Sequence, residues 1–286
     1  MPEVVPHGDR IDNLKWGLDV TNMYTYWMRK MTFIANSGGV PNEMEQLNAG
    51  YREERYAEDP NFTRFSSWNG GNPVGQFEYL SGTPELSKNF DDYDYTLENT
   101  MDAADQRHDV TTRVVISGTY TPNGFGSVAT RNGGGISFYY FKGNAIRVEA
   151  MRDMVNDRGQ IPQELRDAGL EQAIENVLAW NPNAFNSPTA SFSEGGIHFY
   201  YQGVCYYTVL IRHFSNNMVP VLMGYGRYGV VRNNVYQLSI NKIIGPGQPV
   251  INPPGTDPDD EDTSWISADV NIMRWYIRNQ NVEELL

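Results

Sequence analysis

Residues 265–280 read WISADVNIMRWYIRNQ, and their first half alternates between apolar and polar side chains. A period of two places successive side chains on opposite faces, which is typical of a strand with one buried face. The apolar positions are Trp265, Ile266, Ala268, Val270 and Ile272, followed one residue out of phase by Met273, Trp275 and Ile277. A one-residue slip predicts a bulge, or a short break between two strands, after Ile272.

The segment before this strand, residues 249–263, contains four prolines and an acidic run from Asp257 to Asp262. Proline fixes φ and removes a backbone donor, so this composition predicts a stiff, solvated tether without regular structure. An amphipathic strand on such a tether must bury its apolar face in its own sheet or in the sheet of another molecule. The residues alone leave both possibilities open.

Composition excludes several classes of function. The chain has 286 residues, 40% of them hydrophobic, and a net charge of −13, which argues against binding nucleic acid or an anionic membrane surface. One cysteine allows no intramolecular disulfide, and no apolar run approaches the length of a membrane span. Residues 1–20 show no signal-peptide core, so the chain is expected to be cytosolic or to lack its targeting segment.

Alternation and turn residues predict most of the chain to be β-structure. The expected strands cover residues 14–29, 111–120, 136–141 and 236–244, and residues 195–214 form two strands of a hairpin that turns at Gln202-Gly203. Apolar residues near a 3.6 period predict a helix over residues 165–178, and a weaker helix is expected over 144–155. The expected fold is therefore an all-β, antiparallel sandwich with a helical insertion.

Residues 36–110 are rich in Asn, Gly, Asp and Glu and contain Pro60, Pro73 and Pro84. This composition predicts a long, mostly irregular connection over the surface, with an acidic turn at Asp91-Asp92-Tyr93-Asp94. A connection of that length is unusual in a compact domain, which suggests that some ordered structure is hidden in it.

No constellation of catalytic residues emerges. Gly224–Gly229 has the spacing of a dinucleotide fingerprint, but a strand follows it where a helix would be needed. His198 and His213 could be neighbours in the hairpin but lack a third metal ligand, so both are expected to be packed, hydrogen-bonded histidines, and Cys205 is expected to be a buried, inert thiol. The acidic run at Asp257–Asp262 lacks the glycine of a calcium loop. We therefore expect no enzyme activity, no metal site and no cofactor.

Six tyrosines crowd the predicted sheets, at positions 139, 140, 200, 201, 206 and 207. Exposed aromatic rings could bind sugars, but tyrosines packed between sheets are the commoner case. Glycan binding by a tyrosine-rich sheet therefore remains an alternative.

Several pieces of the chain together resemble the fimbrillin family of the Bacteroidales, the shaft pilins of type V fimbriae. They are W16-GLDVTN-22, Y95-TLENT-100, G203-VCYY-207, Y228-GVVRNNVYQLSIN-241 and W265-ISADVNI-272. The last two are the most specific, because they occur in this order and are joined by an acidic, Gly- and Pro-rich tether. The resemblance runs from about Trp16 to Gln280.

This resemblance implies a transthyretin-like C-terminal β-sandwich with an extended C-terminal strand that fills a groove in the next subunit. It also implies an extracellular, cell-surface fimbrium, with other fimbrial subunits as partners and host or bacterial surface glycans or proteins as adhesion targets. Family members resemble lipoproteins with a whole N-terminal sandwich, of which residues 1–32 look like only the final strand.

We therefore interpret the chain as a structural, non-enzymatic fimbrial subunit that polymerises by donating its C-terminal strand to a neighbouring subunit. Residues 1–110 would hold the last strand of an N-terminal domain and an irregular segment, residues 111–248 the sandwich, and residues 249–286 the tether and donor strand. The alternative is a surface adhesin for glycans or host molecules, in which the tyrosine-rich sheet binds and the tail folds back on its own chain.

Overall fold

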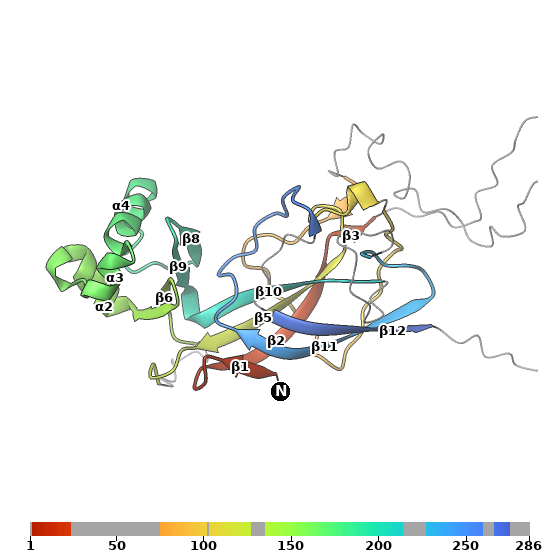
Figure 1. The fold of residues 1–286 in the computed structure, drawn as a ribbon, viewed down its shortest axis with the longest axis horizontal. Helices are drawn as coiled ribbons and strands as arrows, with labels where there is room; N and C mark the ends of the chain where they lie inside the picture. Colours follow the sequence, from red (N-terminus) through yellow and green to blue (C-terminus); the bar gives the residue numbers. More distant parts are fainter. Residues whose placement is uncertain are drawn as a thin grey trace, which may run out of the picture.

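The computed structural model describes residues 2–23, 75–101, 103–126, 135–213, 227–259 and 266–274. These residues form a β-sandwich with a smaller lobe of strands and helices at one end (Figure 1). The expected all-β fold with a helical insertion is confirmed.

The first sheet of the sandwich has the order β10-β5-β2, with antiparallel neighbours. Its strands are β2 (Arg10–Asp19), β5 (Arg113–Thr121) and β10 (Val204–Leu210). Every residue of β5 except three is buried, which is the pattern of a central strand covered on both faces.

The second sheet has the order β1-β11-β12. Its strands are β1 (Glu3–Val5), β11 (Asn234–Ile244) and β12 (Ile266–Arg274). β1 runs parallel to β11 but pairs only with Lys242–Ile244, whereas β12 runs antiparallel to β11 from Asn234 to Ile243. The central strand of this sheet is therefore β11.

One apolar core joins the two sheets. It contains buried side chains from both, including Ile116 of β5, Tyr207 of β10 and Ile243 of β11. Leu14 and Leu18 of β2 pack against it. The alternation in residues 14–22 and 236–244 thus marks the faces that meet in this core.

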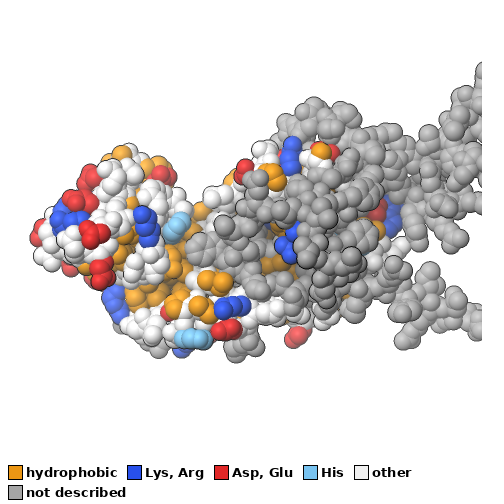
Figure 2. Space-filling model, in the orientation of Figure 1, with side chains coloured by type: hydrophobic (Ala, Val, Ile, Leu, Met, Phe, Trp, Pro, Cys, Tyr) orange, Lys and Arg blue, Asp and Glu red, His pale blue; other side chains and the backbone are white. Residues whose placement is uncertain are grey.

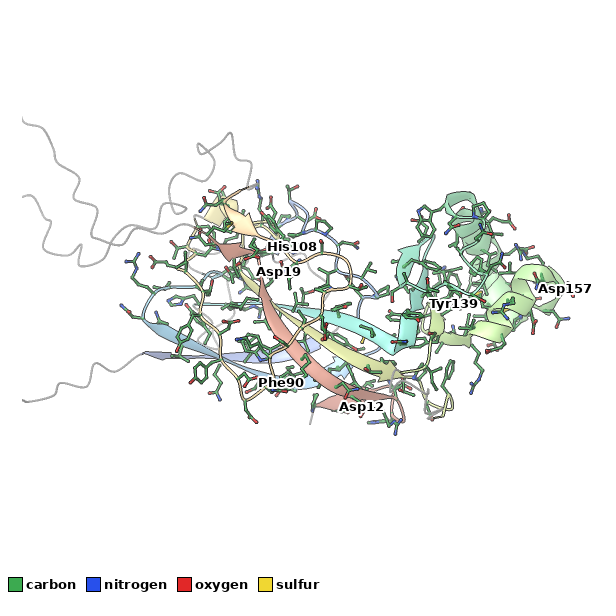
Figure 3. All side chains as sticks on the ribbon, turned by 180° about the vertical axis from the view of Figure 1, so that it is seen from behind. Asp12, Asp19, Phe90, His108, Tyr139 and Asp157 are labelled. Atoms are coloured by element: carbon green, nitrogen blue, oxygen red, sulfur yellow. The ribbon has the colours of Figure 1, made fainter. Side chains whose placement is uncertain are left out.

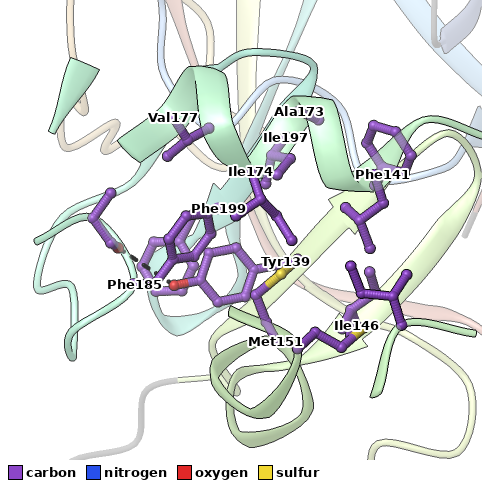
Figure 4. Close-up of a cluster of buried hydrophobic side chains, with 14 of the residues drawn as sticks. Tyr139, Phe141, Ile146, Met151, Ala173, Ile174, Val177, Phe185, Ile197 and Phe199 are labelled. Atoms are coloured by element: carbon purple, nitrogen blue, oxygen red, sulfur yellow. Dashed lines mark hydrogen bonds between the residues drawn. The ribbon is translucent and has the colours of Figure 1, made fainter. Parts of the chain in front are cut away.

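The second lobe is inserted between β5 and β10. Its sheet has the order β7-β6-β9-β8, from β6 (Phe138–Phe141), β7 (Asn144–Arg147), β8 (Phe192–Glu194) and β9 (Ile197–Tyr200). The helices are α2 (Val148–Asn156), α3 (Gln163–Asp167) and α4 (Leu170–Trp180). Side chains of α2 and α4, among them Met151 and Ile174, pack on Tyr139 and Phe199 in a separate core (Figure 4).

The surface of this lobe carries charges of both signs (Figure 2), and Asp157 lies at its far tip (Figure 3).

The expected helix over residues 165–178 is interrupted between α3 and α4 at Gly169, whose φ of 89° is the left-handed conformation that ends α3. The expected weaker helix is confirmed in α2, after a short strand.

The remaining described segments are short. β3 (Thr21–Asn22) pairs with β4 (Phe77–Glu78), and 3-10 turns cover Ala103–Asp105, Arg158–Gln160 and Tyr201–Gly203. Between Tyr79 and Asn99 only isolated bridges occur, so the expected irregular connection is confirmed for this part. Residues 24–74, which include the end of the strand expected at 14–29, lie outside the described residues.

One expectation about the strands needs correction. The segment 195–214 is not a hairpin, because β9 pairs with β6 and β8 while β10 pairs with β5 in the other sheet. Gln202, at φ 53°, turns the chain from one sheet into the other. At the other end of the chain, β1 pairs with β11 and β2 with β5, so residues 3–19 lie with the sandwich although they precede the boundary expected at residue 111.

Candidate functional site: the terminal strand and its strap

Strand β12 contains the predicted apolar row, and it lies opposite an apolar row of β11. Ile266 pairs with Ile243, Ala268 with Ile240, Val270 with Leu238 and Ile272 with Tyr236. The polar row matches in the same way, since Asn271 pairs with Gln237 and Asp269 with Ser239. Directly opposed residues on an antiparallel pair share a face, so this register sets apolar residues against apolar ones.

The predicted bulge after Ile272 is wrong. Met273 pairs with Val235 and Arg274 with Asn234, in an unbroken register with the preceding residues. β11 has an apolar residue at Val235, directly opposite Met273. The apolar positions therefore move to the other face in both strands at the same point, and the pairing is unbroken. The irregularity instead lies in β11, between Ile240 and Lys242, where Asn241 is the extra residue. Trp265, Trp275 and Ile277 lie outside the described residues.

Among the described strands, β12 has β11 as its only neighbour, so β12 is an edge strand of its own chain's sheet. An edge strand leaves backbone donors and acceptors unpaired along one side. The β11 residues that face the core beside it, Tyr236, Leu238 and Ile240, are only half-buried although they pack on the core. This part of the core is therefore only partly shielded from solvent.

The segment between β11 and β12 is a strap, defined here as residues Gly245–Asp259, that lies along the sandwich. Two buried core tyrosines hold its beginning through their hydroxyl groups. The Tyr200 hydroxyl lies 2.6 Å from the carbonyl oxygens of both Pro246 and Gly247, and the Tyr207 hydroxyl donates to the Gly245 carbonyl at 2.9 Å. Buried hydroxyls need such partners, so both tyrosines depend on the strap.

Backbone hydrogen bonds hold the middle of the strap. Tyr206 and Gln248 exchange two bonds of 2.8 Å, and Gly82 and Ile251 exchange bonds of 2.8 and 2.7 Å. A Cβ at Gly247 would lie 2.2 Å from the Tyr206 carbonyl oxygen, so only glycine permits this close approach. The strap thus joins β10 to the irregular segment near Gly82.

The strap ends at a buried residue. Asp259 is 2% exposed, its carboxylate accepts a hydrogen bond from the Thr111 hydroxyl, and its N–H donates to the Gln106 carbonyl at 3.1 Å. The His108 N–H also donates to the Asp257 carbonyl. The tether expected over residues 249–263 is therefore attached to the sandwich as far as Asp259, because residues 106–111 bind it, although Asn252, Pro253 and Gly255–Asp257 are exposed as expected. Residues 260–265 lie outside the described part of the chain.

A buried ion pair joins Asp19, labelled in Figure 3, to Arg113 at the start of β5. The Asp19 carboxylate accepts hydrogen bonds from the Val20 and Leu80 N–H groups and lies 2.6 Å from Nη2 of Arg113. A buried carboxylate with this many donors is a structural anchor for three segments. Over the described ranges, no three His, Cys, Asp or Glu side chains gather closely enough to hold a metal ion.

Packing and hydrogen bonding account for the two histidines and the cysteine that could have taken part in catalysis or metal binding. His198 on β9 hydrogen-bonds the Ser193 hydroxyl, while His213 lies 2.6 Å from the Tyr236 hydroxyl, so the expected hydrogen-bonded histidines are confirmed, each with its own partner. Burial lowers the pKa of His198. Cys205 is fully buried, and burial raises the pKa of its thiol to about 12. The prediction of a buried thiol is confirmed, and a protonated thiol is a poor nucleophile.

The tyrosines that suggested glycan binding are mostly inside the molecule. Tyr139, Tyr200, Tyr206 and Tyr207 are each less than 5% exposed, and Tyr140 and Tyr201 are half-buried. Phe138 stacks on Tyr200 with ring centroids 4.7 Å apart. The tyrosine-rich sheet therefore offers core packing and not an open aromatic surface.

Sequence reasoning missed the polar partners of the strap. Thr111, Tyr200 and Tyr207 bind it through single hydroxyl groups from distant parts of the chain, and no local pattern marks such residues. The buried Asp259 stands in a run of acids that is otherwise typical of solvated chain. The only local hint was the glycine and proline content of Gly245–Pro249, which is typical of a chain that passes close to another backbone.

Comparison with known proteins supports the resemblance. Residues 198–281 match the family described as major fimbrial subunit protein type IV, fimbrillin, C-terminal. The matched region begins in β9 and contains β10, β11, the strap and β12. A search of curated proteins found no match to the chain. This family implies association with other fimbrial subunits at the cell surface. No helix in the described part of the chain is long and apolar enough to cross a membrane.

Proposed function

We propose that this chain, whose residues 198–281 match the fimbrillin C-terminal family, is a structural fimbrial subunit that joins its neighbours through strand β12. The observation that carries the proposal is the ladder between β11 and β12. It combines a matched apolar row with an edge position, and the strap before it is fixed to the sandwich.

Strand addition is a common way to connect subunits, because backbone hydrogen bonds supply affinity and alternate side chains supply specificity. The apolar positions of the donor strand would be Ile266, Ala268, Val270, Ile272 and Met273, with Trp265, Trp275 and Ile277 beside them. Each aliphatic side chain of this size contributes about 1.5–3 kcal/mol when it is fully buried. A strand with several such positions can therefore hold a polymer together.

The proposal divides the chain into parts with different roles. β1, β2, β5, β10 and β11 form the sandwich body, the strap fixes the chain to it as far as Asp259, and residues 265–280 act as the donor strand. The partners are other fimbrial subunits, and the location is an extracellular fimbrium.

A pair of single substitutions tests the role of the strand. Val270→Asp places a charge in the apolar row opposite Leu238, whereas Asn271→Asp places the same charge in the polar row opposite Gln237. Burying an unpaired carboxylate costs several kcal/mol, so Val270→Asp should abolish assembly while Asn271→Asp assembles like the unaltered chain. Size-exclusion chromatography at a fixed concentration measures the assembled fraction. Equal assembly of the two variants would refute the proposal.

A further inference from the structure

We infer that the protein binds a small monocarboxylate in a cavity between the strap and the outer face of the sheet β10-β5-β2. The cavity has a volume of about 150 Å³, and its lining includes His108 beside residues of β5, β10 and the strap. It is separate from the ladder between β11 and β12. The inference therefore goes beyond the proposed function and does not depend on it.

The floor of the cavity is the face of the sheet that points away from the sandwich core. Val115 of β5 and Thr208 of β10 are direct partners in the ladder, and Arg113 lies two residues before Val115, so the three share this face. The strap forms the roof, through Gln248 and the run from Ile251 to Gly255. Gln248 and most of that run are exposed, so a single layer of chain separates the cavity from solvent.

The lining supplies hydrogen-bond donors that the fold does not use up. Arg113 binds one carboxylate oxygen of Asp19 through Nε and Nη2, at 2.7 and 2.6 Å, so its Nη1 remains outside the pair. Nε2 of His108 is buried and has no hydrogen-bond partner among the described residues. The hydroxyl of the half-buried Thr208 is a third donor. Because buried polar atoms normally have partners, this lining favours a ligand that accepts hydrogen bonds.

The charges around the cavity fit a ligand with one negative charge. A carboxylate only accepts hydrogen bonds, and bonds to it are about twice as strong as those between neutral groups. Asp19 already offsets most of the Arg113 charge, so a second negative charge on the ligand would find no cation. Asp109 is held in an ion pair with Arg107, and the exposed Asp257 is screened by water, so neither strongly repels the ligand.

The volume and the apolar part of the lining fit a short alkyl chain. An apolar cavity of about 150 Å³ holds benzene, a molecule of about six non-hydrogen atoms. Butyrate has the same number of such atoms. The buried Val115 and Ile251 line the cavity and would contact its alkyl chain, while its carboxylate accepts from Arg113, His108 and Thr208.

A titration of the full-length chain with butyrate, followed by ligand-observed NMR, tests the inference. Butanamide has nearly the same shape without the charge and is the matched control ligand. We expect saturable binding of butyrate and binding of butanamide that is about tenfold weaker, because charge-assisted hydrogen bonds are the stronger ones. No saturable binding of butyrate would show that the cavity holds only water and would overturn the inference, as would equal binding of the two ligands.

Two further ligands test the ligand class. Inorganic phosphate carries more charge and no alkyl chain, so it should bind more weakly than butyrate. The tripeptide Ala-Ala-Ala has a terminal carboxylate but is larger than the cavity, so it should not displace butyrate. Tighter binding of phosphate would overturn the assignment to a monocarboxylate, and displacement by the peptide would overturn the assignment to a small free acid.

Three substitutions locate the site. Thr208→Val keeps the shape of the side chain but removes a donor to a charged group, so it should weaken butyrate binding about tenfold or more. Thr256→Val, at an exposed position of the strap outside the lining, is the control and should bind like the unaltered chain.

His108→Leu guards against a variant that merely fails to fold. It removes a nitrogen that has no partner in the described part of the chain, so thermal unfolding should remain at the temperature of the unaltered chain while butyrate binding is lost. Unchanged butyrate binding in the folded Thr208→Val and His108→Leu variants would place the ligand elsewhere and overturn the inference.

Discussion

Thr111 illustrates how single polar side chains fix the path of the chain in this protein. It is fully buried two residues before β5, and its hydroxyl donates to the carboxylate of Asp259 at the end of the strap. The hydrogen bond joins residues 148 positions apart in the sequence. The place from which β12 departs therefore depends on a contact that no local pattern in the sequence records.

Replacing Thr111 with valine should destabilise the fold. Thr111→Val keeps the shape of the side chain but leaves a buried carboxylate without this donor, which costs about 1–3 kcal/mol. Urea unfolding monitored by circular dichroism would measure the loss. Thr256→Val, at an exposed position of the same strap, is the control and should change the free energy of unfolding by less than about 0.5 kcal/mol. Equal stability of the two variants would contradict the account.

Cys205 should be unreactive in the folded protein. Burial raises the pKa of its thiol to about 12, so the thiolate that reacts is scarce at pH 8, and the side chain is also inaccessible. We expect iodoacetamide at pH 8 to modify the thiol in denaturant and to leave it largely unmodified in native buffer. Mass spectrometry gives the modified fraction. Complete modification of the native protein within minutes would contradict this, because it would show that the reagent reaches the core around β10.

At the scale of elements, alternation predicted the strands well where one face of a strand meets the core. β2, β11 and β12 were expected from apolar residues at alternate positions, whereas β5 was expected from its consecutive β-branched residues Val114, Val115 and Ile116. Pairing was harder to predict. The predicted hairpin failed because Gln202-Gly203 directs β10 into another sheet, and a turn sequence alone does not say which neighbour the next strand will have.

The short β1 was not expected, since three residues are too few to show a period. The strap was expected to be solvated because its prolines and acids are typical of exposed chain. Its backbone is instead hydrogen-bonded to β10 and to Gly82, through contacts that only the folded chain brings together. The apolar row of the candidate donor strand could be read from the sequence, whereas its partner β11, the register and the bulge at Asn241 could not.

Helix α4 offers a test of the inserted lobe. Ile174 is fully buried against the lobe's own sheet, so Ile174→Ala leaves a cavity and should destabilise the lobe by about 2–5 kcal/mol. Glu171→Ala, on the exposed face of the same helix, is the control and should have a much smaller effect. Hydrogen exchange should show faster exchange in α2 and α4 of the first variant, with β5 and β10 still protected. Equal loss of protection in β5 would show that the two cores unfold as one unit.

At the scale of the whole molecule, the inserted lobe and strand β12 lie toward opposite ends (Figure 1). The lobe of residues 138–200 has its own core and a mixed-charge surface at one end (Figure 2). β12 runs along the opposite part of the molecule, at the edge of the second sheet (Figure 1). The strand that is proposed to leave the subunit is thus remote from the inserted lobe, and its exchange would leave the lobe's core unchanged.

Electron microscopy and size-exclusion chromatography of the full-length chain beside a chain that lacks residues 264–286 test the central claim most directly. The deleted residues begin beyond the last anchor of the strap at Asp259, so the strap and the lobe keep their contacts, while β11 loses its partner β12. The account predicts filaments or higher oligomers from the full-length chain and folded monomers from the shortened one, with circular dichroism confirming the fold. Filaments formed equally by both chains would contradict it.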